Sequence, residues 1–564
     1  MENKEYMLID GNPVEINGEK YLLEVIRKAG IELPTFCYHS ELSVYGACRM
    51  CMVENSHGGM EAACSTVPKA GMEIYTNTER LHKHRKMILE LLLANHCRDC
   101  TTCQKNGKCR LQELASLFGL ESIRFKNLKP EPELDTSSLS IIRDAHKCIL
   151  CGDCVRMCNE IQNVGAIDFV HRGSKMVIGP AFNEPIAKSP CVGCGQCAAV
   201  CPTGAIVIRK DTGRVWPELN DKNTKVVAQV APAVRVAMAK EFGLPENENS
   251  MGRITAALRR LGFDEVYDTA TGADLTVLEE SNEFLQRIEA GENLPLITSC
   301  CPAWIQYCEK NHPELMKNIS TCKSPMQMFS SVIKAKYATS SRRVVCVAVM
   351  PCTAKKFECA REEFMHDGVP ETDYVITTQE LIQMIHKAGI VFEELEPEAV
   401  DSVFSTCTGA GVIFGASGGV TEAVLRRLST DKSNKALMSI AFNDVRGMKG
   451  GKETTIPYGD KEVRIAIVSG LKNAESVIQA LKNGEHYDFI EVMACPGGCV
   501  AGGGQPFGTN ATKEVRGKAL YSADKMLSIK RSEENPLMIS LYDGVLKGRV
   551  HELLHVHYNH KEDE

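Results

Sequence analysis

Cysteine spacing constrains this chain more than any other feature of its sequence. Counting one of the adjacent Cys300 and Cys301, nineteen of the 26 cysteines fall into groups whose spacings are typical of cluster ligands. In chain order the groups are Cys37, Cys48, Cys51 and Cys64; His96, Cys100, Cys103 and Cys109; Cys148, Cys151, Cys154 and Cys158; Cys191, Cys194, Cys197 and Cys201; then Cys300-Cys301, Cys352 and Cys495-x3-Cys499. Thiolates are the usual protein ligands of iron–sulfur clusters. The chain is therefore predicted to conduct electrons through several clusters to a metal reaction centre.

The composition limits where such a chain works and what it binds. The formal net charge of −7 over 564 residues argues against a nucleic-acid-binding protein, which needs a basic face. No apolar run approaches the roughly 18 residues of a membrane span, and the first residues lack the pattern of a signal peptide. We therefore expect a cytoplasmic chain without a membrane span, in which so many cysteines indicate metal sites rather than disulfides.

The chain divides into four predicted domains, on the usual size of about 150 residues each. Residues 1–80 are β-rich, with a hairpin (6–9 and 14–17), a helix (21–29) and a strand (72–75). Residues 81–125 contain two helices, 85–94 and 111–117. Residues 126–210 open with a linker (126–142), and residues 211–564 alternate strands and helices. That alternation is typical of parallel sheets with helices on both faces.

Most of the strand-like runs of the last domain end at a motif. The runs are 226–230, 294–298, 344–349, 463–468 and 489–493, with helices such as 251–261 and 379–388 between them. Four of the five runs lead into Ala231-Pro232, Cys300-Cys301, Pro351-Cys352 or Cys495. Ligand sites in such sheets lie beyond the carboxyl ends of the strands. We therefore expect these strand ends to converge on one crevice.

Residues 143–210 contain an internal repeat, a Cys-x2-Cys-x2-Cys-x3-Cys run that begins at Cys148 and again at Cys191. In two-cluster ferredoxins with this spacing, the fourth cysteine of each run binds the other cluster. The crossed pairing predicts two ligand sets, which are Cys148, Cys151 and Cys154 with Cys201, and Cys191, Cys194 and Cys197 with Cys158. Zinc is the alternative, and the doubled motif disfavours it.

The first two groups are less specific by spacing alone. Cys37-x10-Cys48-x2-Cys51-x12-Cys64 predicts a [2Fe–2S] site in its β-rich surroundings, with zinc as the alternative. In the second group the histidine ligand stays open, because His96 could be a surface residue and Cys97 could bind in its place. Imidazole ligation is expected to raise the potential of a cluster relative to all-thiolate ligation.

Three C-terminal motifs carry a resemblance that covers essentially the whole chain. They are Thr298-Ser-Cys-Cys-Pro-Ala-Trp304, Met350-Pro-Cys-Thr-Ala-Lys-Lys-Phe-Glu358 and Glu491-Val-Met-Ala-Cys-Pro-Gly-Gly-Cys499. With the cysteine groups, they resemble the [FeFe]-hydrogenases of the long monomeric type. The region before residue 210 is also similar to the electron-input region of NADH-quinone oxidoreductase large subunits and some formate dehydrogenases. There the motif that begins at His96 binds a [4Fe–4S] cluster.

The resemblance implies a multidomain α+β and α/β fold. A β-grasp [2Fe–2S] ferredoxin-like domain, a small helical His/Cys domain and a 2[4Fe–4S] ferredoxin-like domain precede a large α/β H-cluster domain. The implied cofactors are one [2Fe–2S] cluster, three accessory [4Fe–4S] clusters and an H-cluster. The H-cluster is a [4Fe–4S] cubane bridged to a two-iron subcluster with CO, cyanide and azadithiolate ligands. Its implied ligands, of which the last bridges to the subcluster, are Cys301, Cys352, Cys495 and Cys499.

Other residues receive roles from the same resemblance. Neighbouring side chains point apart in an extended chain, so one of Cys300 and Cys301 is free for other work. The resemblance makes Cys300 the proton donor. It also implies that Lys355 contacts a cyanide ligand, since a buried lysine needs a negative partner; an exposed lysine at a strand end is the alternative, which suits Lys356 better. The residues implied to flank the subcluster are Pro232, Ala233, Met350 and Met493.

A helix expected over 275–288 places Glu280, Glu283 and Arg287 on one stripe, within about 60° of one another. Taken alone, such a stripe indicates a solvated face with an ion pair. The resemblance instead implies a proton relay from Cys300 to solvent through Glu280, Ser320, Glu283 and Arg287. Burial would raise the pKa of Glu280 and let it exchange protons.

The implied function is reversible oxidation of H2 and reduction of protons. The implied partners are ferredoxin or a similar low-potential carrier, and maturation proteins that supply the two-iron subcluster. The chain is then a monomer or a subunit of a redox complex. The alternatives are the H2-activating subunit of an electron-bifurcating complex that uses ferredoxin and NADH, a hydrogen sensor, and an iron–sulfur assembly protein. The retention of every cluster ligand disfavours the assembly protein, and a sensor usually carries a signalling domain.

Three positions depart from the family pattern. Ala233 stands where serine is usual, Ala303 where glycine is usual and Met326 where glutamine is usual. The changes at Ala233 and Met326 are expected to remove hydrogen bonds near the subcluster. Six further cysteines have no assigned role, and we expect them to be buried packing residues: Cys97, Cys308, Cys322, Cys346, Cys359 and Cys407.

Overall fold

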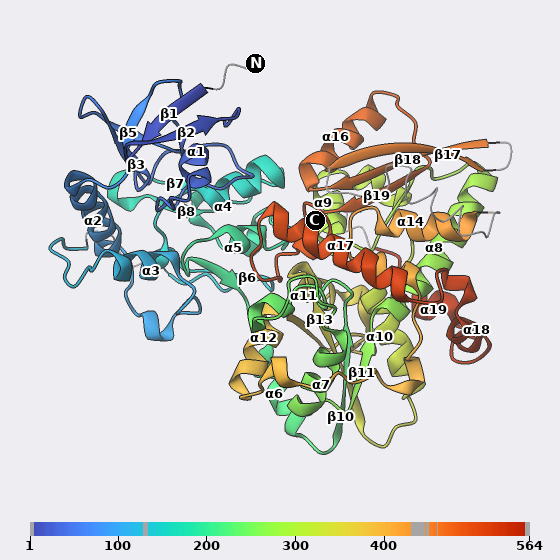
Figure 1. The fold of residues 1–564 in the computed structure, drawn as a ribbon. Helices are drawn as coiled ribbons and strands as arrows, with labels where there is room; N and C mark the ends of the chain where they lie inside the picture. Colours follow the sequence, from blue (N-terminus) through green and yellow to red (C-terminus); the bar gives the residue numbers. More distant parts are fainter. Residues whose placement is uncertain (1–4, 128–132, 430–445, 447–449, 459–460, 559–564) are drawn as a thin grey trace.

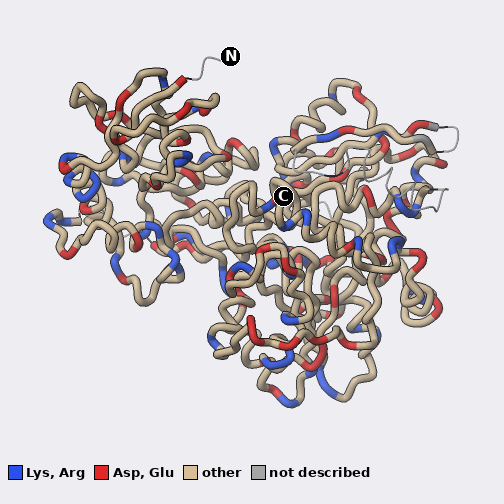
Figure 2. Tube along the Cα trace, viewed as in Figure 1, with Lys and Arg blue, Asp and Glu red and all other residues tan. Residues whose placement is uncertain are grey.

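The computed structural model describes residues 5–127, 133–429, 446, 450–458 and 461–558. Figure 1 shows the N-terminal part as small units on one side and the rest of the chain as a larger body on the other. The larger body has two lobes, each built on a four-stranded sheet. Lysines and arginines are interspersed with acidic residues over all of these parts (Figure 2).

The first unit is a five-stranded sheet with one helix against it. The strand order is β2-β1-β5-β3-β4, in which β1 and β5 run parallel. Buried Leu22 and Ile26 of the helix pack with Met7 and Ile74 of the sheet. The expected hairpin, helix and last strand are present, and the β3–β4 hairpin is additional. The elements are β1 (Glu5–Ile9), β2 (Asn12–Ile16), α1 (Leu22–Lys28), β3 (Met52–Asn55), β4 (Met60–Ala62) and β5 (Glu73–Tyr75).

Two helices and a pair of two-stranded sheets follow. The first helix begins after Thr78, whose hydroxyl accepts a hydrogen bond from the Leu81 amide at 3.2 Å. The last residues of the expected linker (126–142) belong to a strand, β6, which pairs antiparallel with β9. The elements are α2 (Glu79–Ala94), α3 (Arg110–Leu117), β6 (Ile141–Arg143), α4 (Asp153–Arg156), β7 (Asp168–Val170), β8 (Val177–Gly179), α5 (Gln196–Val200) and β9 (Ile206–Ile208).

One lobe of the large body is built on a fully parallel sheet with the order β11-β10-β13-β16. Alternate residues of β10 pack to opposite sides, with Val226 in the core of one face and Val227 in the core of the other. Helices cover both faces, as the alternating sequence predicted. The elements are α6 (Thr212–Asn220), β10 (Thr224–Val230), α7 (Met251–Leu261), β11 (Glu265–Asp268), α8 (Ala270–Ala290), α10 (Pro325–Lys336), β13 (Arg343–Met350), α11 (Ala354–Glu358), β14 (Met365–His366), β15 (Val369–Pro370), β16 (Tyr374–Thr377) and α12 (Thr378–Lys387).

The other lobe is built on a sheet with the order β12-β19-β18-β17, in which only β17 runs antiparallel. Trp304 and Ile490 belong to the core on one face, and Phe284 and Ile465 to the core on the other. The strands β11, β16 and β17 complete the two sheets and were not expected. The elements are β12 (Leu296–Ile297), α9 (Pro302–Asn311), α13 (Gly409–Ile413), α14 (Gly419–Leu428), β17 (Gly451–Tyr458), β18 (Lys461–Ser469), α16 (Leu471–Lys482) and β19 (Phe489–Met493).

Three helices close the chain: α17 (Asn510–Met526), α18 (Pro536–Asp543) and α19 (Val550–Leu554). In Figure 1, α17 runs across the middle of the large body, between the two lobes. Its buried Leu520 packs with Ala233 and Val412, so this helix joins elements of different lobes. Within the described residues, no helix has both the length and the apolar character needed to cross a membrane.

Candidate active site

The carboxyl ends of strands from both lobes meet at one cavity. The segments after β10, β12, β13 and β19 all contribute residues to its wall. Protein atoms leave about 620 Å³ unfilled among these residues, a space that includes part of the open solvent. Two sheets therefore serve a single site beyond their strand ends. The predicted residues that line it are Pro232, Ala233, Cys300, Cys301, Met350, Cys352, Lys355, Met493 and Cys499.

Four thiols surround one side of this cavity. Cys301, Cys352 and Cys499 line it, and Cys495 is buried beside them. Burial, followed by the nearby charges of the other three thiols, raises the pKa of Cys495 well above its usual value. The Ala494 amide donates a hydrogen bond to Cys301 Sγ at 3.4 Å. All four cysteines are free thiols, so they form one donor set from both sheets.

Lys355 places a cation in the wall of the cavity. Its Nζ donates to the Glu358 carboxylate at 2.7 Å and to the Cys300 carbonyl at 3.3 Å. Burial alone would lower the pKa of Lys355, but the Glu358 charge raises it above its usual value. The lysine therefore stays charged. The negative partner that the structure gives it is a carboxylate, which the sequence analysis did not foresee.

The expectation that Lys356 is exposed is wrong. Its side chain is buried and forms ion pairs with Asp211 at 2.7 Å and Glu380 at 2.9 Å. The reason is that both lysines lie in α11, which starts at Ala354 shortly after β13 ends, and adjacent residues of a helix point in different directions. One lysine of the Lys355-Lys356 pair therefore faces the cavity and the other faces α12.

Two of the departures from the family pattern replace a polar residue by an apolar one, and both lie at the cavity. Ala233 and Met326 are each 1% exposed and line its wall. Their backbone carbonyls accept hydrogen bonds, at 2.8 Å from Gln505 Nε2 and at 3.0 Å from Gln229 Nε2. Polar contact at both positions therefore comes from the backbone, because the side chains offer none.

Sequence reasoning missed part of the lining. The additional residues are Thr269, Ala273, Pro325, Phe414 and Gly415, whereas Ala231 and Pro351 confirm the expected convergence of strand ends. A signal for Phe414 and Gly415 was present in the glycine-rich stretch 407–419. A Cβ atom on Gly415 would lie 3.1 Å from the Cβ of Ala233, so glycine is needed where these segments approach.

Glu283 is the centre of the predicted proton relay. Ser320 Oγ donates to its Oε2 at 2.8 Å, and Arg287 Nη2 pairs with its Oε1 at 2.5 Å. The Thr321 amide donates to both carboxylate oxygens, at 3.1 and 3.0 Å. Glu283 is only 9% exposed. The reading of this stripe as a solvated face is therefore wrong, although the ion pair it included is present.

Glu280 is fully buried, and within the described part of the chain neither of its carboxyl oxygens has a hydrogen-bond partner. Burial, and then the Glu283 carboxylate, raise its pKa to about 8. Burial, and then the charge of Glu280, raise the pKa of Cys300 well above its usual value. Cys300 is therefore a neutral thiol at the cavity, next to a carboxyl group that titrates near neutral pH.

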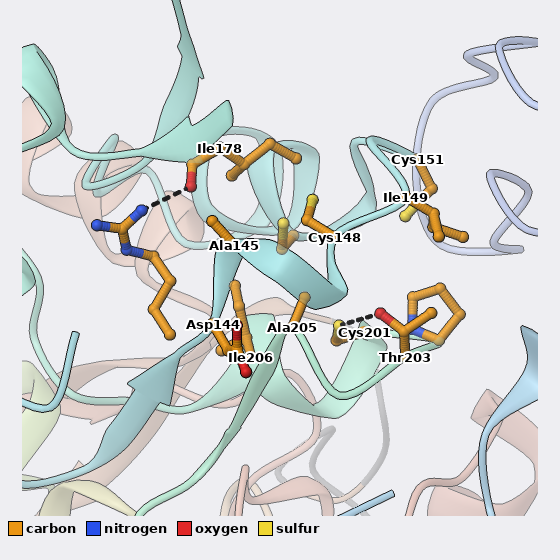
Figure 3. A pocket seen from close by; sticks show the side chains of 13 residues that line it. Asp144, Ala145, Cys148, Ile149, Cys151, Ile178, Cys201, Thr203, Ala205 and Ile206 are labelled. Atoms are coloured by element: carbon orange, nitrogen blue, oxygen red, sulfur yellow. Dashed lines mark hydrogen bonds between the residues drawn. The ribbon is translucent and has the colours of Figure 1, made fainter. Parts of the chain in front are cut away.

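The repeated cysteine runs come together in a crossed arrangement. Cys148, Cys151, Cys154 and Cys201 line a second, small cavity, shown in Figure 3. Cys197 belongs to the other set. Burial, and then the nearby charges of Cys191 and Cys158, raise its pKa, so these three thiols lie close together. Which cluster each set holds stays a prediction. Among the described residues, no three or more His, Cys, Asp or Glu side chains are arranged to hold a single metal ion.

Three of the expected cluster sites border one apolar core. Cys37 and Cys48 of the first group, Cys109 of the second and Cys151 of the third all belong to it. Arg156, in the region of the third group, contacts the first unit: its Nη2 donates a hydrogen bond to the Cys37 carbonyl at 2.9 Å. The first, second and third groups therefore meet at a junction near Cys151.

The cysteines without an assigned role differ in burial. Cys308, Cys322 and Cys346 are buried as expected. Cys359 and Cys407 are only partly buried. Cys97 is also only partly buried, and its Sγ donates to the Asp99 carboxylate at 3.2 Å.

Comparison with known families gives a match to each of these parts. The model for the iron-only hydrogenase large subunit, C-terminal domain, matches residues 224–503, and the iron hydrogenase small subunit matches residues 510–561. A 2Fe-2S iron-sulfur cluster binding domain matches residues 6–79. The NADH-ubiquinone oxidoreductase-G iron-sulfur binding region matches residues 85–124, and a 4Fe-4S dicluster domain matches residues 147–211.

Individual relatives extend the match to nearly the whole chain. The NADP-reducing hydrogenase subunit HndD of Solidesulfovibrio fructosivorans is 40% identical over 98% of each chain. Iron hydrogenase 1 of Clostridium pasteurianum is 35% identical over 98% of this chain and 99% of its own. The chain belongs to the [FeFe]-hydrogenases. A solved variant of the Chlamydomonas reinhardtii [FeFe]-hydrogenase is 36% identical, with a TM-score of 0.53 over 62% of this chain and 98% of that one.

The site of this [FeFe]-hydrogenase fits the cofactor that its family implies. Buried thiols from two sheets offer ligands for a cluster. Lys355 supplies a cation for anionic ligands, and Met350 and Met493 supply soft apolar packing. Gly415 leaves space that a side chain would fill. The family's oxidoreductase class agrees with this donor set.

The region of this [FeFe]-hydrogenase that matches a 4Fe-4S dicluster domain packs directly on the same site. Gln196 Nε2 donates to the Ala501 carbonyl at 2.9 Å, and Thr353 Oγ1 donates to the Gly193 carbonyl at 2.7 Å. Burial, followed by the charges of Cys197 and Cys495, raises the pKa of Cys194. The cysteine run that begins at Cys191 and the four thiols of the cavity are therefore neighbours.

Proposed function

We propose that this chain catalyses reversible oxidation of H2 and reduction of protons at an H-cluster. Its cubane is held by Cys301, Cys352, Cys495 and Cys499. The observation that carries the proposal is the convergence of strand ends from two sheets on one cavity lined by these thiols and by a charged, buried Lys355. A cavity with this donor set suits a large anionic cluster better than a single metal ion.

When bound, the H-cluster supplies an iron site for H2 and a base for the proton. The chain supplies the surroundings. Met350, Met493, Phe414 and Pro232 give the cavity an apolar wall that excludes water. Lys355 holds a positive charge there, and Glu358 keeps that charge in place at 2.7 Å. Electrostatic interactions are stronger in such a dry site than in water.

Proton transfer is assigned to residues of this chain. Cys300 carries a neutral thiol at the cavity, so it can hand over a proton without bearing a permanent charge. Glu280, with a pKa of about 8, accepts and returns that proton at the pH of the cell. Ser320 and Glu283 continue the path through their 2.8 Å hydrogen bond, and Arg287 holds Glu283 in position.

Electron transfer is assigned to four accessory clusters in three domains. We propose a β-grasp [2Fe–2S] domain over 1–80, a small [4Fe–4S] domain with one histidine and three cysteine ligands over 81–125, and a 2[4Fe–4S] ferredoxin-like domain over 126–210, ahead of the catalytic domain over 211–564. The shared apolar core around Cys37, Cys109 and Cys151 makes the first two clusters alternative entry points into the third. Cys194 and Gln196 lie next to the four thiols that would hold the cubane, so the bound clusters would supply electron transfer there, to or from ferredoxin or a similar carrier.

A comparison of the chain produced without and with maturation proteins distinguishes this proposal from its alternatives. The chain produced without maturation proteins should bind iron–sulfur clusters and show no H2 turnover. After maturation, infrared spectroscopy should show CO and cyanide bands, and the protein should evolve and consume H2. A Cys499→Ser variant is the matched control, since it should keep the accessory clusters and lose the bands. Absence of the bands from the matured native chain would refute the assignment.

A second candidate concerns the assembly. The relative named as an NADP-reducing hydrogenase subunit matches 98% of this chain, which favours a role as the H2-activating subunit of a nucleotide-linked complex. Purification of the native protein under mild conditions distinguishes the two. A co-purifying flavin-containing subunit and H2-dependent reduction of NAD(P) support the complex, and a monomer that reduces only ferredoxin excludes it.

A further inference from the structure

The predicted proton relay ends at a residue that is poorly suited to release a proton. Arg287 has a guanidinium group, which stays charged in proteins and has five donors but no acceptor. It donates to the Glu283 carboxylate and to three backbone carbonyls, those of Asn293, Asn318 and Ile319. Arg287 can orient Glu283, but a proton that arrives at Glu283 needs another acceptor to reach water.

A second hydrogen-bonded chain begins beside Glu283. The Thr321 amide holds the Glu283 carboxylate, and the hydroxyl of the same threonine lies 2.9 Å from His555 Nδ1. The other ring nitrogen, Nε2, lies 3.1 Å from Glu279 Oε2. The remaining oxygen of Glu279 accepts a hydrogen bond from the Tyr542 hydroxyl. These contacts lead away from Glu283 through a hydroxyl and an imidazole, which both donate and accept, to a carboxylate that accepts.

The fold brings these residues together from three distant segments. Glu279 and Glu283 are four residues apart on α8, so they share one face of the helix. The segment after α19 pairs antiparallel with residues 321–323, through the Cys322–His555 bridge and the 2.7 Å hydrogen bond from the Val556 amide to the Thr321 carbonyl. The C-terminal segment therefore delivers His555 to the proton stripe.

Three of these groups are almost equally buried, and only Tyr542 at the end of the chain is more exposed. Glu283 is 9% exposed, and the side chains of His555 and Glu279 are 8% and 9% exposed. Tyr542 is only partly buried. Burial alone would raise the pKa of Glu279, but the hydrogen bonds from His555 and Tyr542 lower it below its usual value. Glu279 is thus a buried, ionised acceptor that lies beside the partly exposed Tyr542.

Among the described residues, other charged and titratable groups face this chain, including Arg287 and Glu280 beside Glu283. Arg427 and Tyr542 face Glu279 from α14 and α18, and the His551 ring lies 4.7 Å from that of His555. The Cys322 Sγ lies 3.8 Å from Glu283 Oε2, and burial raises its pKa, so it adds no charge. Histidine is the side chain best suited to this position, because its two ring nitrogens can accept and release a proton near neutral pH.

We propose that protons pass between Glu283 and solvent through Thr321, His555 and Glu279, with Tyr542 at the exit. This inference rests on the proposed hydrogenase function and on Glu283 as a relay residue. In the outward direction the Glu283 carboxyl gives its proton to the Thr321 hydroxyl, after rotation of that side chain, and the hydroxyl passes its own proton to His555 Nδ1. His555 Nε2 then releases a proton to Glu279, which passes it to water. Each passage leaves the imidazole in the other tautomer, and a ring flip restores it.

The test uses the fully matured protein and variants at His555. His555→Ala should lower H2 turnover at least about tenfold, with the CO and cyanide bands unchanged. Added imidazole should restore a large part of this turnover, because it replaces the proton carrier. His555→Gln keeps hydrogen-bonding groups without a transferable proton and should be equally slow. The matched control is His551→Ala, an exposed neighbouring histidine that should keep full turnover.

The outcomes separate a relay from a structural role. Turnover that stays unchanged in His555→Ala overturns the proposal. Native H2 turnover in His555→Gln would make His555 a packing residue. So would a loss of turnover in His555→Ala that imidazole does not reverse. Either result also overturns the proposal. Cys300→Ser, measured in parallel, tests the proposed function itself. If that variant keeps full turnover with its cofactor bands intact, the proton relay as a whole is wrong, whatever His555 does.

Discussion

Replacing Glu280 by glutamine tests the buried proton relay most directly. Glutamate has an ordinary pKa of 4.5, and burial together with Glu283 raises that of Glu280 to about 8. At pH 7 about nine-tenths of the folded molecules then carry the proton, compared with about 0.3% at the ordinary pKa. The surroundings of Glu280 therefore increase the occupancy of a transferable proton roughly 300-fold.

The same shift makes Glu280 a destabilising residue at neutral pH. In the unfolded chain the carboxyl group loses its proton above pH 4.5, and in the folded chain only above about pH 8. Stability therefore falls as the pH rises between these values, because the unfolded state is the one that releases the proton. At about 1.36 kcal/mol per pH unit, the loss at pH 7 is roughly 3 kcal/mol. Glu280→Gln should recover this amount at pH 7 and almost none of it at pH 4.5.

Turnover and infrared spectroscopy on the same samples check both consequences. Glu280→Gln should lower H2 turnover by about 10²- to 10⁴-fold, with intact CO and cyanide bands and a higher midpoint of chemical unfolding at pH 7. The native protein should show a protonated-carboxyl band that disappears with a midpoint near pH 8. Glu289→Gln, on the exposed end of the same helix, is the control. A band that titrates near pH 4.5, or full turnover in Glu280→Gln, would refute the reasoning.

Three further predictions concern other parts of the molecule. Lys355→Met leaves Glu358 buried without its partner and should lower the free energy of unfolding by about 3–5 kcal/mol; adding Glu358→Gln should restore stability but not H2 turnover. Arg156→Leu removes the hydrogen bond to the carbonyl of the first cysteine ligand and should slow electron entry from the [2Fe–2S] cluster severalfold, measured by rapid-freeze spectroscopy. His96→Cys should lower the potential of its cluster, whereas Cys97→Ser should leave that potential unchanged.

Each of these predictions has a matched comparison. Lys387→Met and Arg172→Leu change exposed residues of the same types and should have no effect. If Lys355→Met is as stable as the native protein, the Glu358 pair does not hold the cavity wall. If Arg156→Leu transfers electrons at the native rate, the junction does not depend on this contact. A change of potential in Cys97→Ser would make Cys97, rather than His96, the ligand.

The architecture of the large domain followed from the sequence because its strands are buried on both faces. Such strands are nearly continuous apolar runs, and all five predicted runs are strands in the structure. The strands that escaped notice lack this signal. β11, for example, includes the charged Glu265 and Asp268, and β16 is only four residues long. Their place is fixed by pairing with β10 and β13, which a single segment does not reveal.

The site shows where local pattern stops being informative. The spacing of Glu280, Glu283 and Arg287 gave their shared stripe but not their burial, which depends on Ser320 and Thr321 from a distant segment. Lys355 and Lys356 are adjacent, yet one faces the cavity and the other faces Asp211. His555 carried no sequence signal at all. Long-range pairing decides each of these environments, and a single sequence contains no direct record of it.

Topology separates the two routes that we propose for protons and for electrons from the cavity. β11 ends at Asp268, Thr269 lines the cavity, and α8 starts at Ala270. At 1.5 Å per residue, Glu280 lies about 10 Å and Arg287 about 20 Å further along the helix axis than Ala273, which also lines the cavity. In Figure 1, α8 lies in the part of the large body that faces away from the cluster domains. Because α8 starts at a strand end, it carries its carboxylates away from the cavity wall that Gln196 and Thr353 occupy. The proposed proton route and the proposed electron route therefore diverge from the cavity.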